Sequence, residues 1–145
     1  LSPFWHRMRP GSFLRVFKIF SAKDFRTKEE QILDLTSFKY KKHEKSSQIV
    51  QSWKKYRDEF PIKKSSILRQ VYAASSYKLI DKLKVSCSIY LGEDDELCSI
   101  KCGNALAKFL NVEAGLCQQA GHDLPLDNPG WLIREVQKKI SQIQQ

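Results

Sequence analysis

Apolar residues recur at helical spacing through the first half of the chain. Thr27 and Glu30 fit a capping box, in which the Thr27 side chain begins a helix and Glu30 reaches back to it. A second helix is predicted over residues 44–60, where apolar side chains form one stripe: Ile49, Trp53, Tyr56 and Phe60. A third, shorter helix fits residues 65–75. Residues 13–20 are apolar enough to form a strand, although their alternation is imperfect.

The pattern changes near residue 84. Residues 85–91 are short and rich in β-forming side chains, which predicts a strand, and residues 113–118 predict a second one. Helices are predicted over residues 100–110 and 131–143, and the second has an apolar stripe along one side: Leu132, Val136, Ile140 and Ile143. Alternating strands and helices favour part of a parallel α/β sheet with crossover helices. Because two strands cannot form a stable sheet covered on both faces, we expect further strands in the first half or outside this chain.

Positive charge is concentrated in the first half. The net charge is +9, with 20 Lys and Arg against 8 Asp and Glu in residues 1–84 and 5 against 8 in residues 85–145. Such asymmetry is typical of a segment that binds nucleic acid or another anionic surface, or of a solvated helical face. No nucleic-acid-binding motif accompanies these lysines, so nucleic acid is not the expected partner.

The four cysteines do not have the spacing of common zinc sites. Cys98 and Cys102 are separated by three residues rather than two, and we interpret all four as reduced, part-buried thiols, as in a cytoplasmic protein. We expect no metal and no cofactor. No apolar run approaches the roughly 18 residues of a membrane span. The chain begins with Leu1 rather than Met, so we expect a processed or incomplete chain.

Chemistry-bearing residues follow the two predicted strands. The first strand ends in Gly92-Glu93-Asp94-Asp95, and the second leads to Gly121-His122-Asp123-Leu124-Pro125. This arrangement resembles the end of the α/β-hydrolase fold, whose penultimate strand ends in Gly-x-x-Asp and whose last strand leads to Gly-His. The resemblance implies an α/β fold: the C-terminal part of an α/β-hydrolase, with its last parallel strands and crossover helices. Residues 1–66 would then be a helical cap or lid, and residues 67–145 part of the core.

The same resemblance implies two catalytic residues. Asp95 matches the acid of the catalytic triad and His122 the base, with Asp94 as the nearest competitor for the acid. In this family the histidine takes the nucleophile's proton, while the aspartate fixes the imidazole tautomer. The expected substrate is a small ester-like molecule, cleaved through an acyl-serine as in esterases and lipases.

The family's nucleophile is missing from the sequence. No Gly-x-Ser-x-Gly occurs in the 145 residues, and the family's chain order of Ser, Asp, His places that motif upstream of Leu1. We therefore expect the chain to be the C-terminal portion of a serine hydrolase that supplies the acid and the base but cannot catalyse alone. Two alternatives stay open: a non-catalytic truncated remnant, and a basic binding module for nucleic acid or an anionic surface.

Overall fold

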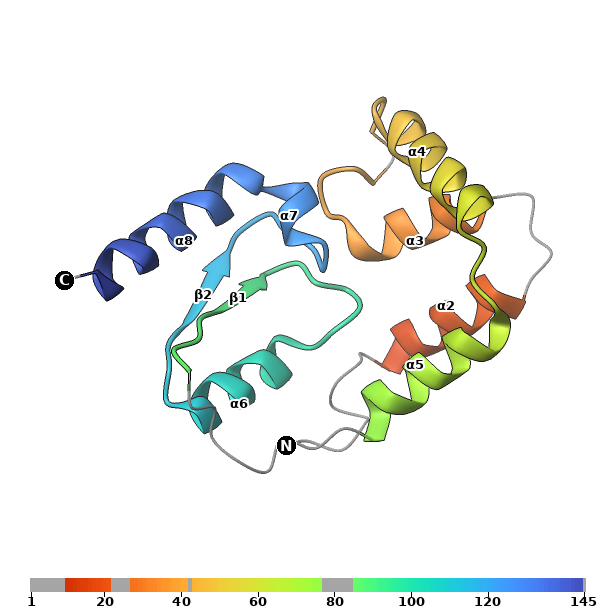
Figure 1. Ribbon diagram of the computed structural model, residues 1–145. Coiled ribbons are helices and arrows are strands. Elements are labelled where there is room, and N and C mark those ends of the chain that lie inside the picture. Colours follow the sequence, from red (N-terminus) through yellow and green to blue (C-terminus); the bar gives the residue numbers. More distant parts are fainter. Residues whose placement is uncertain (1–9, 22–26, 42, 77–84, 145) are drawn as a thin grey trace.

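The computed structural model describes residues 10–21, 27–41, 43–76 and 85–144, and the first half of this part is helical (Figure 1). Its four helices are α2 (Pro10–Ser21), α3 (Lys28–Thr36), α4 (Ser46–Glu59) and α5 (Lys64–Ser76). Helix α3 packs against both α2 and α4. The boundary predicted between residues 66 and 67 falls inside α5.

The capping box at the start of α3 is confirmed. The Thr27 hydroxyl accepts a hydrogen bond from the Glu30 backbone N–H, and the Glu30 carboxylate accepts one from the Thr27 backbone N–H at 2.7 Å. Leu33 and Leu35 then lie on the buried side of this helix. The local sequence therefore fixes where α3 begins, and burial of its apolar side fixes how it faces its neighbours.

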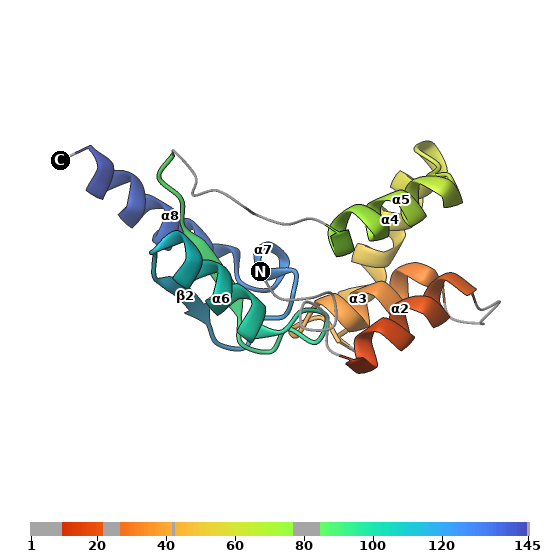
Figure 2. The ribbon, with the colours of Figure 1, turned by 90° about the horizontal axis from the view of Figure 1, so that it is seen from below.

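The second half contains a pair of strands with helices around it. Strands β1 (Ile89–Gly92) and β2 (Ala114–Cys117) are parallel, with Ile89 opposite Ala114 and Gly92 opposite Cys117. Helix α6 (Ile100–Leu110) connects them and packs on both. Helices α7 (Leu124–Asp127) and α8 (Pro129–Ile143) follow β2. Figure 1 shows the strands between α6 and α8, and the later part of α8 lines a hollow together with residues of both strands. Figure 2 shows the same elements from below.

A small apolar core joins β2 to the start of α8. Cys117, Ala120 and Leu124 are its buried members, and Tyr90 and Trp131 pack against them. The Tyr90 and Trp131 rings meet edge to face with centroids 5.7 Å apart, a favourable geometry for two aromatic rings. This core holds the segment between β2 and α7 in place.

The predicted fold class is wrong. The described residues form seven helices and only two strands of four residues each, whereas the C-terminal half of an α/β-hydrolase has several parallel strands. Residues 13–20 lie in α2 rather than in a strand, and α2 packs against α3. The strand predicted over residues 85–91 begins only at Ile89.

Two predicted apolar stripes are only partly buried. In α4, Trp53 is half-buried, but Tyr56 and the following Phe60 are each 64% exposed, so only part of this stripe is covered. In α8, Val136 and Ile140 are likewise exposed. No described helix combines the length and the apolar character that crossing a membrane would require.

Candidate functional site

Asp95 and His122, the predicted acid and base, lie within hydrogen-bonding distance of each other. Asp95 lies in the turn after β1, and His122 lies in the loop after β2. Because the two strands are parallel neighbours, their carboxyl ends lie at the same edge of the sheet. Nδ1 of His122 is 2.9 Å from Oδ2 of Asp95. The aspartate side chain is 14% exposed and the histidine side chain 42%, so a second molecule can reach the ring from solvent.

The Asp95 carboxylate is oriented by its own turn. Its Oδ1 accepts hydrogen bonds from the backbone N–H groups of Leu97 and Cys98, both at 2.8 Å, which leaves Oδ2 facing His122. The neighbouring Asp94 donates its backbone N–H to the Ala120 carbonyl at 2.9 Å. Among the described contacts, the carboxylate that bonds His122 is therefore that of Asp95, one residue beyond its competitor.

Glycine at position 92 lets the two loops approach each other. A methyl group on Gly92 would overlap the backbone carbonyls of Ala120 and Gly121, which directly precede His122. Next to it, the Glu93 N–H donates to the Cys117 carbonyl at 2.9 Å, which continues the pairing of the strands by one residue. We call residues 118–123, which follow β2 and include His122, the histidine loop. Any larger residue at position 92 would push the turn of Asp95 away from the histidine loop.

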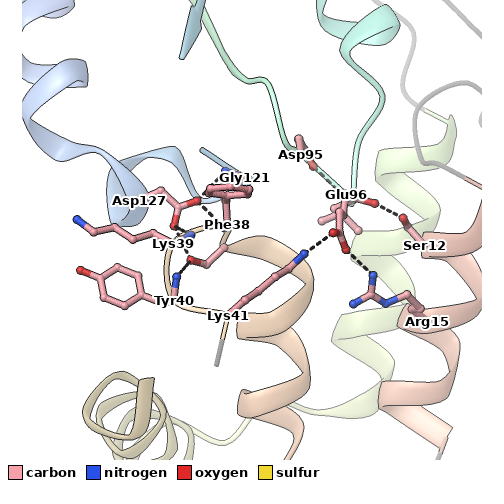
Figure 3. A network of polar contacts seen from close by, with 12 residues as sticks. Ser12, Arg15, Phe38, Lys39, Tyr40, Lys41, Asp95, Glu96, Gly121 and Asp127 are labelled. Carbon is pink, nitrogen blue, oxygen red and sulfur yellow. Dashed lines mark hydrogen bonds and ion pairs between the residues drawn. The ribbon is translucent and has the colours of Figure 1, made fainter. Parts of the chain in front are cut away.

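The histidine loop is fastened to the end of α3 by one buried carboxylate. Asp127 is 3% exposed, and its Oδ2 accepts the backbone N–H groups of Gly121 at 2.6 Å and Phe38 at 2.8 Å (Figure 3). Its Oδ1 accepts from the Ser37 hydroxyl and from the Lys39 N–H. Four donors thus compensate the desolvation of this buried charge.

A second hydrogen bond from the end of α3 holds the residue that follows His122. The N–H of Asp123 donates to the carbonyl of Thr36 at 2.8 Å. The residues on either side of His122 are therefore both held from the α3 end, Gly121 through Asp127 and Asp123 through Thr36. The backbone of the histidine loop is fixed before any ligand binds.

The turn after β1, which carries Asp95, is attached to the helical first half of the chain through Glu96. Its carboxylate pairs with Arg15 at 2.6 Å and with Lys41, and its backbone carbonyl accepts from the Ser12 hydroxyl (Figure 3). The hydrogen bond from Lys41, more than the one from Arg15, lowers the pKa of Glu96, while partial burial opposes it. The side chains of Arg15, Lys41 and Glu96 are 29–46% exposed, so their ion pairs add little stability. The pairs do orient the turn that carries Asp95 toward the helical half.

The environment of His122 favours its protonated form. The hydrogen bond to Asp95 is the largest cause, followed by Cys98, and together they raise the pKa of His122 to about 10 against the opposing effect of burial. The ring is then an imidazolium paired with a carboxylate at neutral pH. Such a pair is ready to donate a proton, and the ring can accept one only after it has lost its own.

A small hollow lies beside the pair. About 200 Å³ is lined by Asp95, Cys98 and His122 together with residues of β1 and α6. Binding sites for drug-sized ligands are usually about 300–1,000 Å³, so this hollow accepts only a small group or one end of a larger molecule.

Sequence reasoning missed three residues of this site. Cys98 was assigned only as a part-buried thiol, and Glu96 and Asp127 had no assigned role in a site. The position of Cys98, three residues after the proposed acid, was a usable signal. Apart from Gly121, the partners of Glu96 and Asp127 named above lie 55–90 positions away, and no local pattern reveals them. Of the other two histidines, His43 is exposed and His6 lies outside the described residues.

Comparison with models of protein families, with curated proteins and with solved structures finds no match to this chain. A function for this chain is therefore inferred from the geometry of Asp95, His122 and their neighbours.

Proposed function

We propose that Asp95 and His122 are the acid and the base of a hydrolase that cleaves small ester-like substrates. The observation that carries the proposal is the 2.9 Å contact between Nδ1 of His122 and Oδ2 of Asp95, with the carboxylate shielded and the ring accessible. A carboxylate that holds one ring nitrogen fixes the tautomer of the imidazole and stabilises its charged form. This geometry supports the roles of Asp95 and His122, whereas the Gly-x-Ser-x-Gly nucleophile is expected from the sequence resemblance alone.

In the proposed reaction, the neutral His122 ring takes the proton of an attacking hydroxyl and then returns it to the leaving alcohol. Asp95 stabilises the imidazolium that exists between these two transfers. Because the pKa of the ring is raised to about 10, the neutral form becomes more abundant as the pH rises toward that value. Turnover limited by proton removal should therefore increase with pH through the neutral and mildly alkaline range.

The nucleophile of this reaction would come from a segment outside the 145 residues, since no Gly-x-Ser-x-Gly occurs in them. The alternative of a basic binding module has less support from the side chains. Arg15 and Lys41 pair with Glu96, and Arg57 pairs with the buried Glu29 at 2.5 Å. These three cations have carboxylate partners and are therefore less available to phosphate groups.

The test begins with the open reading frame that contains these residues. The proposal expects an in-frame Gly-x-Ser-x-Gly within roughly 100–130 codons upstream, and a frame that ends without one overturns it. Hydrolysis of p-nitrophenyl acetate is then measured with the protein from the complete frame. Asp95→Asn and His122→Gln should each lower kcat/KM by at least about a hundredfold.

Asp94→Asn is the matched control. It removes the adjacent carboxylate but keeps the backbone bond from residue 94 to Ala120. Its kcat/KM should stay close to that of the parent protein. Equal losses in the Asp94 and Asp95 variants would show that the acidic turn acts through its charge alone, and would contradict the assignment of Asp95.

A further inference from the structure

Three potential metal ligands converge at the edge of the sheet. One carboxylate oxygen of Asp95, the thiol sulfur of Cys98 and one ring nitrogen of His122 all lie within 4.8 Å of one another. Asp95 and Cys98 belong to the turn between β1 and α6, and His122 belongs to the loop after β2. The cluster therefore joins two segments that are distant in sequence and that the fold holds together independently.

The kinds of atoms in this cluster suit zinc. Thiolate sulfur, imidazole nitrogen and carboxylate oxygen are its usual protein ligands, at about 2.0–2.3 Å from the ion. In a tetrahedral site, bonds of that length place the ligand atoms roughly 3.3–3.8 Å from one another. The observed limit of 4.8 Å leaves only a small inward movement, which side-chain rotation can supply. Calcium and magnesium prefer oxygen ligands, so the sulfur argues against them.

The surrounding contacts hold the ligands in advance. The Asp95 carboxylate bonds the N–H of Cys98 at 2.8 Å, so two of the ligands are tied to each other through the backbone. The third is positioned by the bonds of Gly121 to Asp127 and of Asp123 to Thr36. A site whose ligands are oriented before binding loses less entropy when the ion arrives. The 42% exposure of the His122 side chain gives the ion a path from solvent.

We propose that Asp95, Cys98 and His122 bind one Zn²⁺ ion, with the fourth coordination position open to water or a small ligand. Three protein ligands with one open position are the arrangement of catalytic rather than structural zinc sites. Binding displaces the thiol proton of Cys98 and the ring proton of His122 into solvent, as metal ligands must be deprotonated. The cluster supports this proposal without the hydrolase assignment, but the two roles exclude each other at any one time, because an ion bound to the His122 ring prevents that ring from acting as the base.

The primary test uses the 145-residue chain, freed of metal and reduced, and titrated with Co²⁺ as a spectroscopic substitute for Zn²⁺. The expected result is a sulfur-to-cobalt charge-transfer band that saturates at one ion per chain and disappears when one equivalent of Zn²⁺ is added. Cys98→Ser should abolish the band, and Asp95→Asn and His122→Gln should weaken binding by at least about tenfold. Cys87→Ser, which alters a half-buried thiol outside the cluster, should leave the band unchanged.

A second measurement uses only the unmodified chain, so its result does not depend on whether a variant folds. The unmodified chain is alkylated with iodoacetamide with and without Zn²⁺, and each cysteine is quantified by mass spectrometry. Zinc should slow the alkylation of Cys98 at least about tenfold and leave that of Cys87 unchanged. Equal alkylation of Cys98 in both conditions, or a cobalt band that survives Cys98→Ser, overturns the proposal. Neither readout depends on hydrolase activity.

Discussion

Replacing Asp95 by Asn should return His122 to nearly ordinary acid–base behaviour. The amide oxygen of Asn can still accept the N–H groups of Leu97 and Cys98, so the turn is expected to survive. What is lost is the negative charge beside Nδ1, the largest cause of the raised pKa. We expect the pKa of His122 to fall from about 10 toward its usual 6.5 in this variant.

The same change should alter the dependence of stability on pH. A pKa raised on folding stabilises the native state fully below the unfolded value of 6.5, and this contribution is lost as the pH rises through about 10. The full shift would correspond to about 5 kcal/mol. Because the ring is 42% exposed, solvent screening reduces the expected contribution to about 1 kcal/mol. The parent chain should lose this amount between the two pH values, and Asp95→Asn should not.

The assay is a proton NMR titration of the histidine ring signals in the presence of EDTA, with urea unfolding at each end of the pH range. The chain has three histidines, and His122→Gln identifies the signal that matters. Asp94→Asn serves as the control and should leave the titration midpoint in place. A midpoint near 6.5 in the parent chain, or the same midpoint in parent and Asp95→Asn, would refute the reasoning.

Two further predictions concern the contacts that hold the histidine loop against the end of α3. Asp127→Asn places an amide N–H₂ among backbone donors and should lower the free energy of unfolding by about 3 kcal/mol in urea denaturation, whereas Glu93→Gln, at an exposed position, should change it little. Gly121→Ala brings a methyl group to 2.6 Å from the Thr36 carbonyl and should cost about 2 kcal/mol. Gly11→Ala, which meets nothing within 4 Å in α2, should be neutral or stabilising by up to about 1 kcal/mol, and equal effects at the two glycines would contradict the packing argument.

Local signals in the sequence predicted the features that local chemistry determines. The capping box of Thr27 and Glu30 depends on residues three apart and was located correctly. The meeting of Asp95 and His122 was predictable because both follow strands, and the carboxyl ends of parallel strands share one edge. A short β-rich segment closed by Gly92 was sufficient to place the acid there.

The extent of the sheet was not predictable in the same way. A strand is stabilised by its partners, so an apolar run such as residues 13–20 can belong to a helix or a strand until its neighbours are known. Here the helical half gives that run another helix to pack on, α3, and it becomes part of α2. The apolar side of α8 is only partly covered, and periodicity shows that a helix has an apolar side but not whether anything covers it.

The roles of Asp127 and Glu96 could not be predicted from the sequence, because most of their hydrogen bonds and ion pairs connect distant parts of the chain. Asp127 accepts hydrogen bonds from residues near the end of α3, and Glu96 pairs with Arg15 and Lys41. Each of these carboxylates resembles an ordinary surface acid when only its sequence neighbours are considered. Their positions in the fold explain why the loops of Asp95 and His122 are fixed relative to each other.

The central claim, that His122 and Asp95 activate a nucleophile, is tested most directly by labelling the protein from the complete reading frame with a fluorophosphonate probe. The account predicts a single labelled serine in a Gly-x-Ser-x-Gly motif, with a labelling rate that falls at least about a hundredfold in His122→Gln and is unaffected by Asp94→Asn. An unlabelled parent protein, or labelling at the same rate in His122→Gln, would contradict it.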